Sequence, residues 1–433
     1  MAHESRLPEA IPFRILDSVS GLMKAVVGIL ILIGVVAIVV AAGGEPARLW
    51  ESLLFNWLFW SSLSLGMVLF AAALQMSNAD WAWSVRRFAL GGGTFLPISF
   101  VLFFIVLFGG YKHYFVHWLH NGTDPAIFKK VAWLNWPGLA IRDIIVVTVL
   151  YAFALVYMYY RVRPDVYGVP SSEHRGFYER LTSGFRGVTE EATGCHRVSM
   201  RMAPVLAILY ALLWGIISVD LSMSLQPDWY STMWPPAFIW TGFDGGVVMT
   251  ALLVVAFRSR LRLQGFITGR QFHDLGMLVF AFSVFWMYLN WAQYIVIWYG
   301  QLPFEQSFFI QRFGAPYGPI ASSAVILIFV LPFFGLLTRP PKKVPAILGF
   351  FCVLVLLGEW LQRYLEVYPP LERTPTLPFG FAEVGIGLGF LGLFLAAYLW
   401  YLRRIPVLPS PATLAARGSA VVAAPAPAAV ATE

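Results

Sequence analysis

Acidic residues lie inside long apolar stretches of this sequence, where a charge is costly and needs a partner or a function. Asp244 is the deepest of them. It follows Pro235 by nine residues, which places it about 13.5 Å along a helix and near the middle of a hydrocarbon core of about 30 Å. Two interpretations stay open for Asp244: a protonated carboxyl that hydrogen-bonds a neighbouring helix, and a carboxyl that carries protons across the membrane.

The other acids have simpler structural explanations. Arg363 follows Glu359 by four residues, and an ion pair at that spacing on one helix is a sufficient role for both. Three further acids lie near the ends of apolar stretches on one side of the membrane, where side chains reach the interface easily: Asp143, Asp220 and Glu383. The other side offers Asp80 and the adjacent pair His273 and Asp274. The candidates for a proton pathway are Asp143, Asp220, Asp244, His273, Asp274 and Glu359.

One apolar stretch carries a polar stripe. Ser283, Trp286, Asn290 and Gln293 follow one another at spacings of three and four residues, which places them on one face of a helix, with Tyr294 beside them. Such a stripe must face protein or water and not lipid. Hydrogen bonds between helices explain it as well as a proton wire does, so Gln293 and Tyr294 join the candidates.

Three histidines, His113, His117 and His120, share a face if their segment is helical. A metal site is conceivable there, but no carboxylate or thiol accompanies them, and we favour an extramembrane docking surface. The cysteines, Cys195 and Cys352, are far apart, and there is no C-x-x-C-H motif. We therefore expect no haem, iron-sulfur cluster or metal centre held by this chain.

The composition is that of a membrane protein. The chain has 433 residues, of which 59% are apolar and 12% charged, whereas about a quarter of a soluble domain is charged. A net charge of +7 without a basic patch interleaved with aromatics indicates membrane loops and not a nucleic-acid interface. We expect an all-α polytopic fold with ten spans, at 23–42, 53–75, 92–109, 141–160, 202–221, 235–257, 274–300, 319–337, 345–364 and 382–402.

The distribution of basic residues predicts the orientation. Lysine and arginine are retained on the cytoplasmic side, and 22 of the 30 lie at the two ends of the chain and between spans 2 and 3, 4 and 5, 6 and 7, and 8 and 9. Both termini are therefore predicted in the cytoplasm. The chain divides into an N-terminal segment (1–22), a membrane domain (23–404) and a disordered tail rich in Ala and Pro (405–433). Gly385 and Gly389 provide a small-residue face for intramolecular packing or for a partner.

Several runs resemble one known family. FAFSVFWMYLNWAQYIVIWYGQLPFE (280–305), preceded by HDLG (273–276), is similar to the helix 7 signature of the F subunit of bacterial alternative complex III. VDLSMSLQPDWYSTMW (219–234) resembles that family's segment between helices 5 and 6. Shorter runs add to the resemblance: GEPARLWESLLFNWLFW (44–60), LNWPGLAIRD (134–143) and FLGLFL (390–395).

The resemblance implies a role inside a larger assembly. That family is related to the membrane anchor of polysulfide reductase, and its ten helices form two four-helix bundles (helices 2–5 and 6–9) with two peripheral helices. The complex oxidises quinol and passes electrons through iron-sulfur clusters and c-type haems on partner subunits. A homologous membrane subunit holds the quinol site, and the F subunit is proposed to conduct protons. The expected location is the bacterial cytoplasmic membrane, with lipids and the other subunits of the complex as partners. The hypothesis that Asp244 carries protons comes from its depth in the membrane and not from this resemblance.

Two other functions stay open. The chain is a quinol-binding electron-transfer subunit in the first, with a quinone as its ligand. It is a stand-alone secondary transporter in the second. Transporters usually have paired broken helices near the middle of the membrane, whereas 274–300 has no proline or glycine before Gly300 apart from Gly276 near its start.

Overall fold

A computed structural model describes residues 11–119, 129–167, 174–372 and 374–416 of the chain, which are helical and contain no strand. Ten of the helices are long and apolar enough to cross a membrane, as the sequence predicts. Three of the ten are interrupted by short 3-10 or π segments. Their bounds are α1 (Gly21–Gly44), α2 (Pro46–Met76), α3 with α4 (Arg86–Leu90 and Leu96–Tyr114), α7 (Trp136–Val162), α9 with α10 (Val188–Leu209 and Gly215–Leu221), α11 (Trp234–Phe257), α12 (Gly269–Gly300), α14 with α15 (Gly318–Val325 and Leu331–Gly335), α17 (Pro345–Leu371) and α18 (Phe381–Arg404).

Proline and side-chain caps determine where several of these helices begin. Pro46, Pro235 and Pro345 lie in the first turns of α2, α11 and α17, where a missing backbone N–H costs nothing. At α12, the side chain of Thr268 accepts from the first backbone N–H groups while Gln271 accepts from the N–H of Thr268, which forms a capping box.

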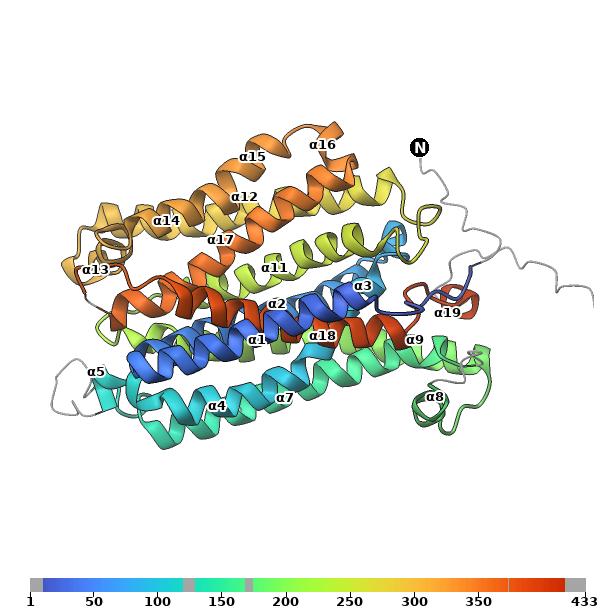
Figure 1. Cartoon of the computed structure of the whole chain (residues 1–433), viewed down its shortest axis with the longest axis horizontal. Helices are drawn as coiled ribbons and strands as arrows, with labels where there is room; N and C mark the ends of the chain where they lie inside the picture. The colour runs from blue at the N-terminus through green and yellow to red at the C-terminus, as the bar shows by residue number, and fades with distance from the viewer. Residues whose placement is uncertain (1–10, 120–128, 168–173, 373, 417–433) are drawn as a thin grey trace, which may run out of the picture.

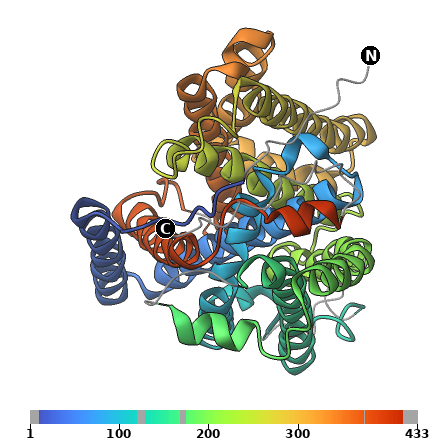
Figure 2. The same cartoon turned by 90° about the vertical axis from the view of Figure 1, so that its right-hand side faces the viewer.

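α2 is the central helix and is buried along nearly its whole length. α4 and α9 pack on one side of it, with α7 beside them, and α11 packs on the other side together with α17. α12 lies against α11, and α14 lies against α17. α1 pairs with α18 at the edge of the molecule. Figure 2, which looks along the helices, separates the yellow-to-orange group from the cyan-to-green group.

Glycine contacts allow the closest of these approaches. A Cβ on Gly66 of α2 would lie 2.0 Å from the carbonyl oxygen of Gly242 on α11, so only glycine fits there. Gly34 of α1 and Gly389 of α18 meet in the same way, and Gly385 lies against Ala37. The small-residue face of the last helix therefore packs inside the chain, against α1.

The connecting segments separate into two ends. The short helices α8 (Arg175–Leu181), α16 (Arg339–Lys343) and α19 (Pro411–Ala415) lie at one end, and α5 (Val116–Leu119) and α13 (Pro303–Phe313) at the other (Figure 1). We call the first the basic end, because most of the lysine and arginine residues belong to segments there. The segments that the sequence assigns to one side of a membrane thus share one end of the molecule.

The tail differs from the expectation. Residues 405–416, which the sequence places in a disordered segment, pack against the helices, and Val407 N–H donates to the carbonyl of Arg14 at 3.0 Å. Asp165 accepts from the backbone N–H of Ser410 at 2.9 Å and from the hydroxyl of Thr413. A disorder prediction from composition misses such specific acceptors. The rest of that segment, 417–433, lies outside the described residues.

Candidate functional site

Two carboxyl groups meet in the interior of the membrane domain. Asp244 on α11 lies beside Glu359 on α17, and both side chains are fully buried. Within the described residues neither oxygen of Asp244 has a hydrogen bond of ordinary geometry. Gly245 makes the approach possible, since a Cβ there would lie 2.5 Å from Oε2 of Glu359. Two neighbouring buried carboxylates repel strongly, so at least one of them holds a proton.

The ion pair expected between Glu359 and Arg363 is not the one that forms. Arg363 Nη1 donates to Glu366 Oε2 at 2.6 Å, and its Nη2 donates to the carbonyl of Phe238 at 2.8 Å. The guanidinium therefore points along α17 toward the opposite end, where Glu366 lies. Glu359 is left to face Asp244.

A π-helical turn places a hydroxyl near this pair. The helix formed by α9 and α10 is interrupted by η4 (Tyr210–Trp214), and such turns often occur at functional positions. The Tyr210 hydroxyl donates to the carbonyl of Ile239 at 2.8 Å and lies near Glu359 and Arg363. An uncharged proton-bearing group, the phenol of Tyr210, thus lies near Glu359.

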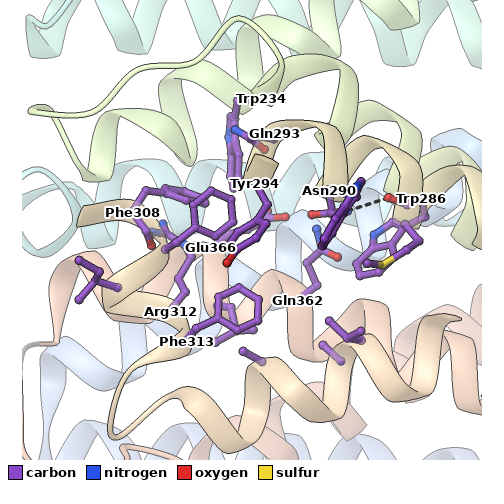
Figure 3. Close-up of a pocket in the computed structure, with 18 residues that line it drawn as sticks. Trp234, Trp286, Asn290, Gln293, Tyr294, Phe308, Arg312, Phe313, Gln362 and Glu366 are labelled. Atoms are coloured by element: carbon purple, nitrogen blue, oxygen red, sulfur yellow. Dashed lines mark hydrogen bonds between the residues drawn. The ribbon is translucent and has the colours of Figure 1, made fainter. Parts of the chain in front are cut away.

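A cavity of about 570 Å³ opens on the far side of Glu366 (Figure 3). Its walls come from α12, α13, α14 and α17, and from Trp234 at the start of α11. The polar stripe expected on 274–300 faces inward, and Asn290, Gln293 and Tyr294 line this cavity. The lining is mainly aromatic and apolar: Trp234, Trp286, Met287, Trp291, Tyr294, Phe308, Phe309, Ile310, Phe313, Ala321, Ala324, Val325 and Leu365.

Arg312 is the buried cation at this cavity. It lies on α13, where its Nη1 donates to Gln226 Oε1 at 3.2 Å and to the carbonyl of Phe308 at 3.0 Å. Its guanidinium lies 3.6 Å from the centroid of the Phe308 ring. Burial lowers the pKa of Arg312, and the negative charge of Glu366 opposes that shift. The cavity wall therefore carries one cation and one anion.

A second carboxyl pair lies at the opposite end of the other helix group. Asp220 on α10 accepts from Arg142 Nε at 2.6 Å and from the indole of Trp133 at 2.7 Å. Asp143 on α7 lies beside Asp220, and both side chains are fully buried. Both acids lie near helix ends, as the sequence predicts, but their side chains are buried and Asp220 is paired with Arg142. Asp220 is therefore an ion-pair partner, while Asp143 has no hydrogen bond of ordinary geometry within the described residues.

His273 and Asp274 lie apart from both carboxyl pairs, in the first turns of α12 at the basic end. His273 Nδ1 is 3.1 Å from Asp274 Oδ1, and both side chains are partly exposed. Leu275 and Val279 follow on the buried face of α12, so apolar side chains come next along this helix.

The histidine face expected from spacing is interrupted. α4 ends at Tyr114 and α5 begins at Val116, so His113 and His117 lie on different helices. His117 Nε2 lies 2.9 Å from the carbonyl of Pro370, and His120 lies outside the described residues. Among the described residues no three metal-binding side chains converge.

Sequence reasoning missed a set of buried charges at the basic end. The distribution of basic residues assigns three arginines to cytoplasmic loops, although all three are buried: Arg86, Arg87 and Arg161. Arg87 pairs with Asp165, and Arg86 Nη2 donates to the carbonyl of Leu74 at 2.8 Å. Proximity to an apolar stretch was the only signal available for them. Sequence reasoning missed Arg312, Gln362 and Glu366 for another reason, because their cavity is assembled from five separate helices.

No protein-family model matches the sequence, and no curated protein is found to be similar to it. The geometry of the carboxyl pair and of the cavity, together with the resemblance of the sequence runs, is the evidence on function.

Proposed function

We propose that this chain is an integral membrane subunit of a quinol-oxidising complex of the alternative complex III type. Its role is structural and proton-conducting, and it holds no redox centre. The observation that carries the proposal is the buried pair Asp244 and Glu359, because a shared proton between two helices is what a transfer step needs. The type of complex is proposed from the resemblance of 280–305 to the helix 7 signature.

The polar groups around the pair support a route toward the opposite end. Glu366 follows Glu359 by seven residues, two turns of α17 or about 10.5 Å, and borders the cavity. Protons from the cavity side reach Glu366, pass Arg363 and Glu359, and are held at Asp244. Toward the basic end, apolar residues follow Asp244 on α11. Transfer in that direction requires water to enter, and the carboxyl pair is the point at which the two half-routes meet.

The surrounding assembly belongs to the same proposal. Helices 2–5 and 6–9 form two bundles, with α1 and α18 peripheral, and the packing of α4, α7 and α9 near α2 and of α12, α14 and α17 near α11 supports that division. Iron-sulfur clusters and c-type haems lie on partner subunits, a homologous subunit oxidises quinol, and the basic end faces the bacterial cytoplasm.

The test is proton movement in vesicles that contain the reconstituted complex. Asp244→Asn keeps the shape of the side chain and removes its transferable proton, so the complex should assemble and oxidise quinol in detergent but lose proton translocation. Asp143→Asn is the matched control, because Asp143 is an equally buried acid beside a second carboxylate.

If vesicles with the Asp244→Asn complex acidify as wild-type vesicles do, Asp244 has no role in proton transfer and is a packing residue. Loss with Asp143→Asn alone would move the route to the other helix group. Purification without any haem-bearing partner would favour the transporter alternative over a subunit of this complex.

A further inference from the structure

The cavity beside Glu366 has the size and walls of a binding site for a small ring compound. Its volume of about 570 Å³ falls within the usual range of roughly 300 to 1,000 Å³ for ligand pockets. Six of its aromatic residues come from α12 and α13: Trp286, Trp291, Tyr294, Phe308, Phe309 and Phe313. Flat rings on facing walls accommodate a planar headgroup through stacking.

Four residues of this lining each carry a buried polar atom that has no hydrogen-bond partner among the described residues. Three are donors, the indole Nε1 of Trp234 and Trp286 and the Nε of Arg312, and one is an acceptor, Oε1 of Gln362. All four are buried, and a buried polar atom left without a partner costs about 1–3 kcal/mol. The amide of Gln362 already contacts Glu366, so its Oε1 is free to accept from an occupant. A ligand that satisfies this set must both accept and donate hydrogen bonds.

The charges and the rim restrict the ligand further. Arg312 and Glu366 carry opposite charges, so the lining offers no net charge to an anion. The rim residues Ile310, Phe313 and Trp291 are 66%, 51% and 51% exposed. Apolar side chains this exposed suit contact with lipid, so we infer that the cavity admits a compound with an apolar tail.

We propose that this cavity binds the headgroup of a neutral, lipid-soluble quinone or quinol, with its ring between the aromatic side chains and its tail leaving past Ile310 and Phe313. Ring oxygens accept from Trp286 and Arg312, and a quinol hydroxyl donates to Gln362. The choice of a quinone rests on the proposed function, whereas the cavity and its unpartnered atoms do not depend on it.

Photolabelling of the purified full-length protein in detergent tests this site. A photoreactive azidoquinone with a short alkyl tail should label peptides of α12, α13, α14, α17 or the start of α11, and excess unlabelled quinone should prevent the labelling. Trp286→Phe keeps an aromatic ring but removes a free donor, so it should weaken binding about three- to tenfold. Trp298→Phe, on the exposed surface of α12 and outside the cavity, is its control and should bind as wild type does. The readout is independent of proton movement, so the two proposals fail separately.

A second variant fills the space without touching the polar groups. Ala324 on α14 lines the cavity, and Ala324→Leu should abolish the labelling, whereas Ser322→Leu on the exposed face of the same helix should leave it unchanged. Labelling that persists in Ala324→Leu, or that maps to other helices, would overturn the proposal. So would a photoreactive phospholipid that labels these peptides and is not displaced by quinone, since the cavity would then be a lipid site.

Discussion

The carboxyl of Asp244 on α11 lies beside the carboxyl of Glu359 on α17, and both side chains are buried. Gly245 leaves the space in which they meet. Neither acid has a base dedicated to it, because Arg363 is bound to Glu366 and to the carbonyl of Phe238. The contribution of each acid to the free energy of unfolding therefore depends on the presence of the other.

This dependence is measurable in a double-mutant cycle. Asp244→Asn and Glu359→Gln should show a coupling energy of about 0.5 to 3 kcal/mol in unfolding free energy, because each changes the partner that the other sees. Unfolding of the purified protein by denaturing detergent gives the free energies. The control cycle pairs Glu359→Gln with Asp143→Asn, whose sites belong to different helix groups and should be additive within about 0.5 kcal/mol. Additivity in the first cycle would contradict the contact.

Removing the cation from the second carboxyl pair should be strongly destabilising. Arg142→Ala leaves Asp143 and Asp220 as adjacent buried acids, and breaking a buried pair on one side costs about 3 kcal/mol or more. Arg175→Ala removes an exposed partner of Glu179 on α8 and should cost less than about 1 kcal/mol. Equal losses of stability for the two variants would show that Asp143 and Asp220 reach water.

The α2–α11 contact predicts a third difference in stability. Gly66→Ala introduces a Cβ 2.0 Å from a backbone oxygen, so the helices must separate, at a cost of about 1–3 kcal/mol or more. Gly28→Ala on α1 meets nothing within 4 Å and is the control. A thermal-unfolding scan of both variants in detergent makes the comparison, and a Gly66→Ala protein as stable as wild type would refute the close approach.

The sequence predicts the ten spans because length and apolarity alone decide which helices cross a membrane. Their bounds are less predictable. α9 begins at Val188, well before the apolar stretch at 202, because its first turns carry Glu190, Arg197 and other polar residues outside the apolar region. An apolar stretch marks the part of a helix that lies within the bilayer, and the helix itself can extend beyond it.

The candidate site was predictable only in part. The depth of Asp244 along its helix identified it from the sequence. The spacing rule for Glu359 and Arg363 compares only residues of one helix four positions apart, so it misses both the contact with α11 and the pairing of Arg363 with Glu366. The stripe on α12 was recognised because spacing of three and four residues is a property of one helix. The cavity that Gln293 and Tyr294 line depends on four further helices, whose arrangement no local pattern encodes.

The orientation of the two ends is tested by labelling of single cysteines. Thr338 lies before α16 at the basic end and Thr376 lies between α17 and α18 at the opposite end, and both are exposed. In intact cells, a membrane-impermeant thiol reagent should label Thr376→Cys and not Thr338→Cys, and both after the membrane is opened. The native Cys195 and Cys352 are buried and give little background. The reverse pattern would invert the whole arrangement.

The contact between Gly34 and Gly389 joins the first membrane helix to the last. A ribosome delivers helices in order, so α1 waits in the bilayer without its partner until α18 has been synthesised. During that interval it must persist as a single helix surrounded by lipid, which agrees with its being the most apolar of the ten. Closure of this contact is a late event of biogenesis, and a chain that stops short of α18 would leave α1 open to capture by quality-control proteases.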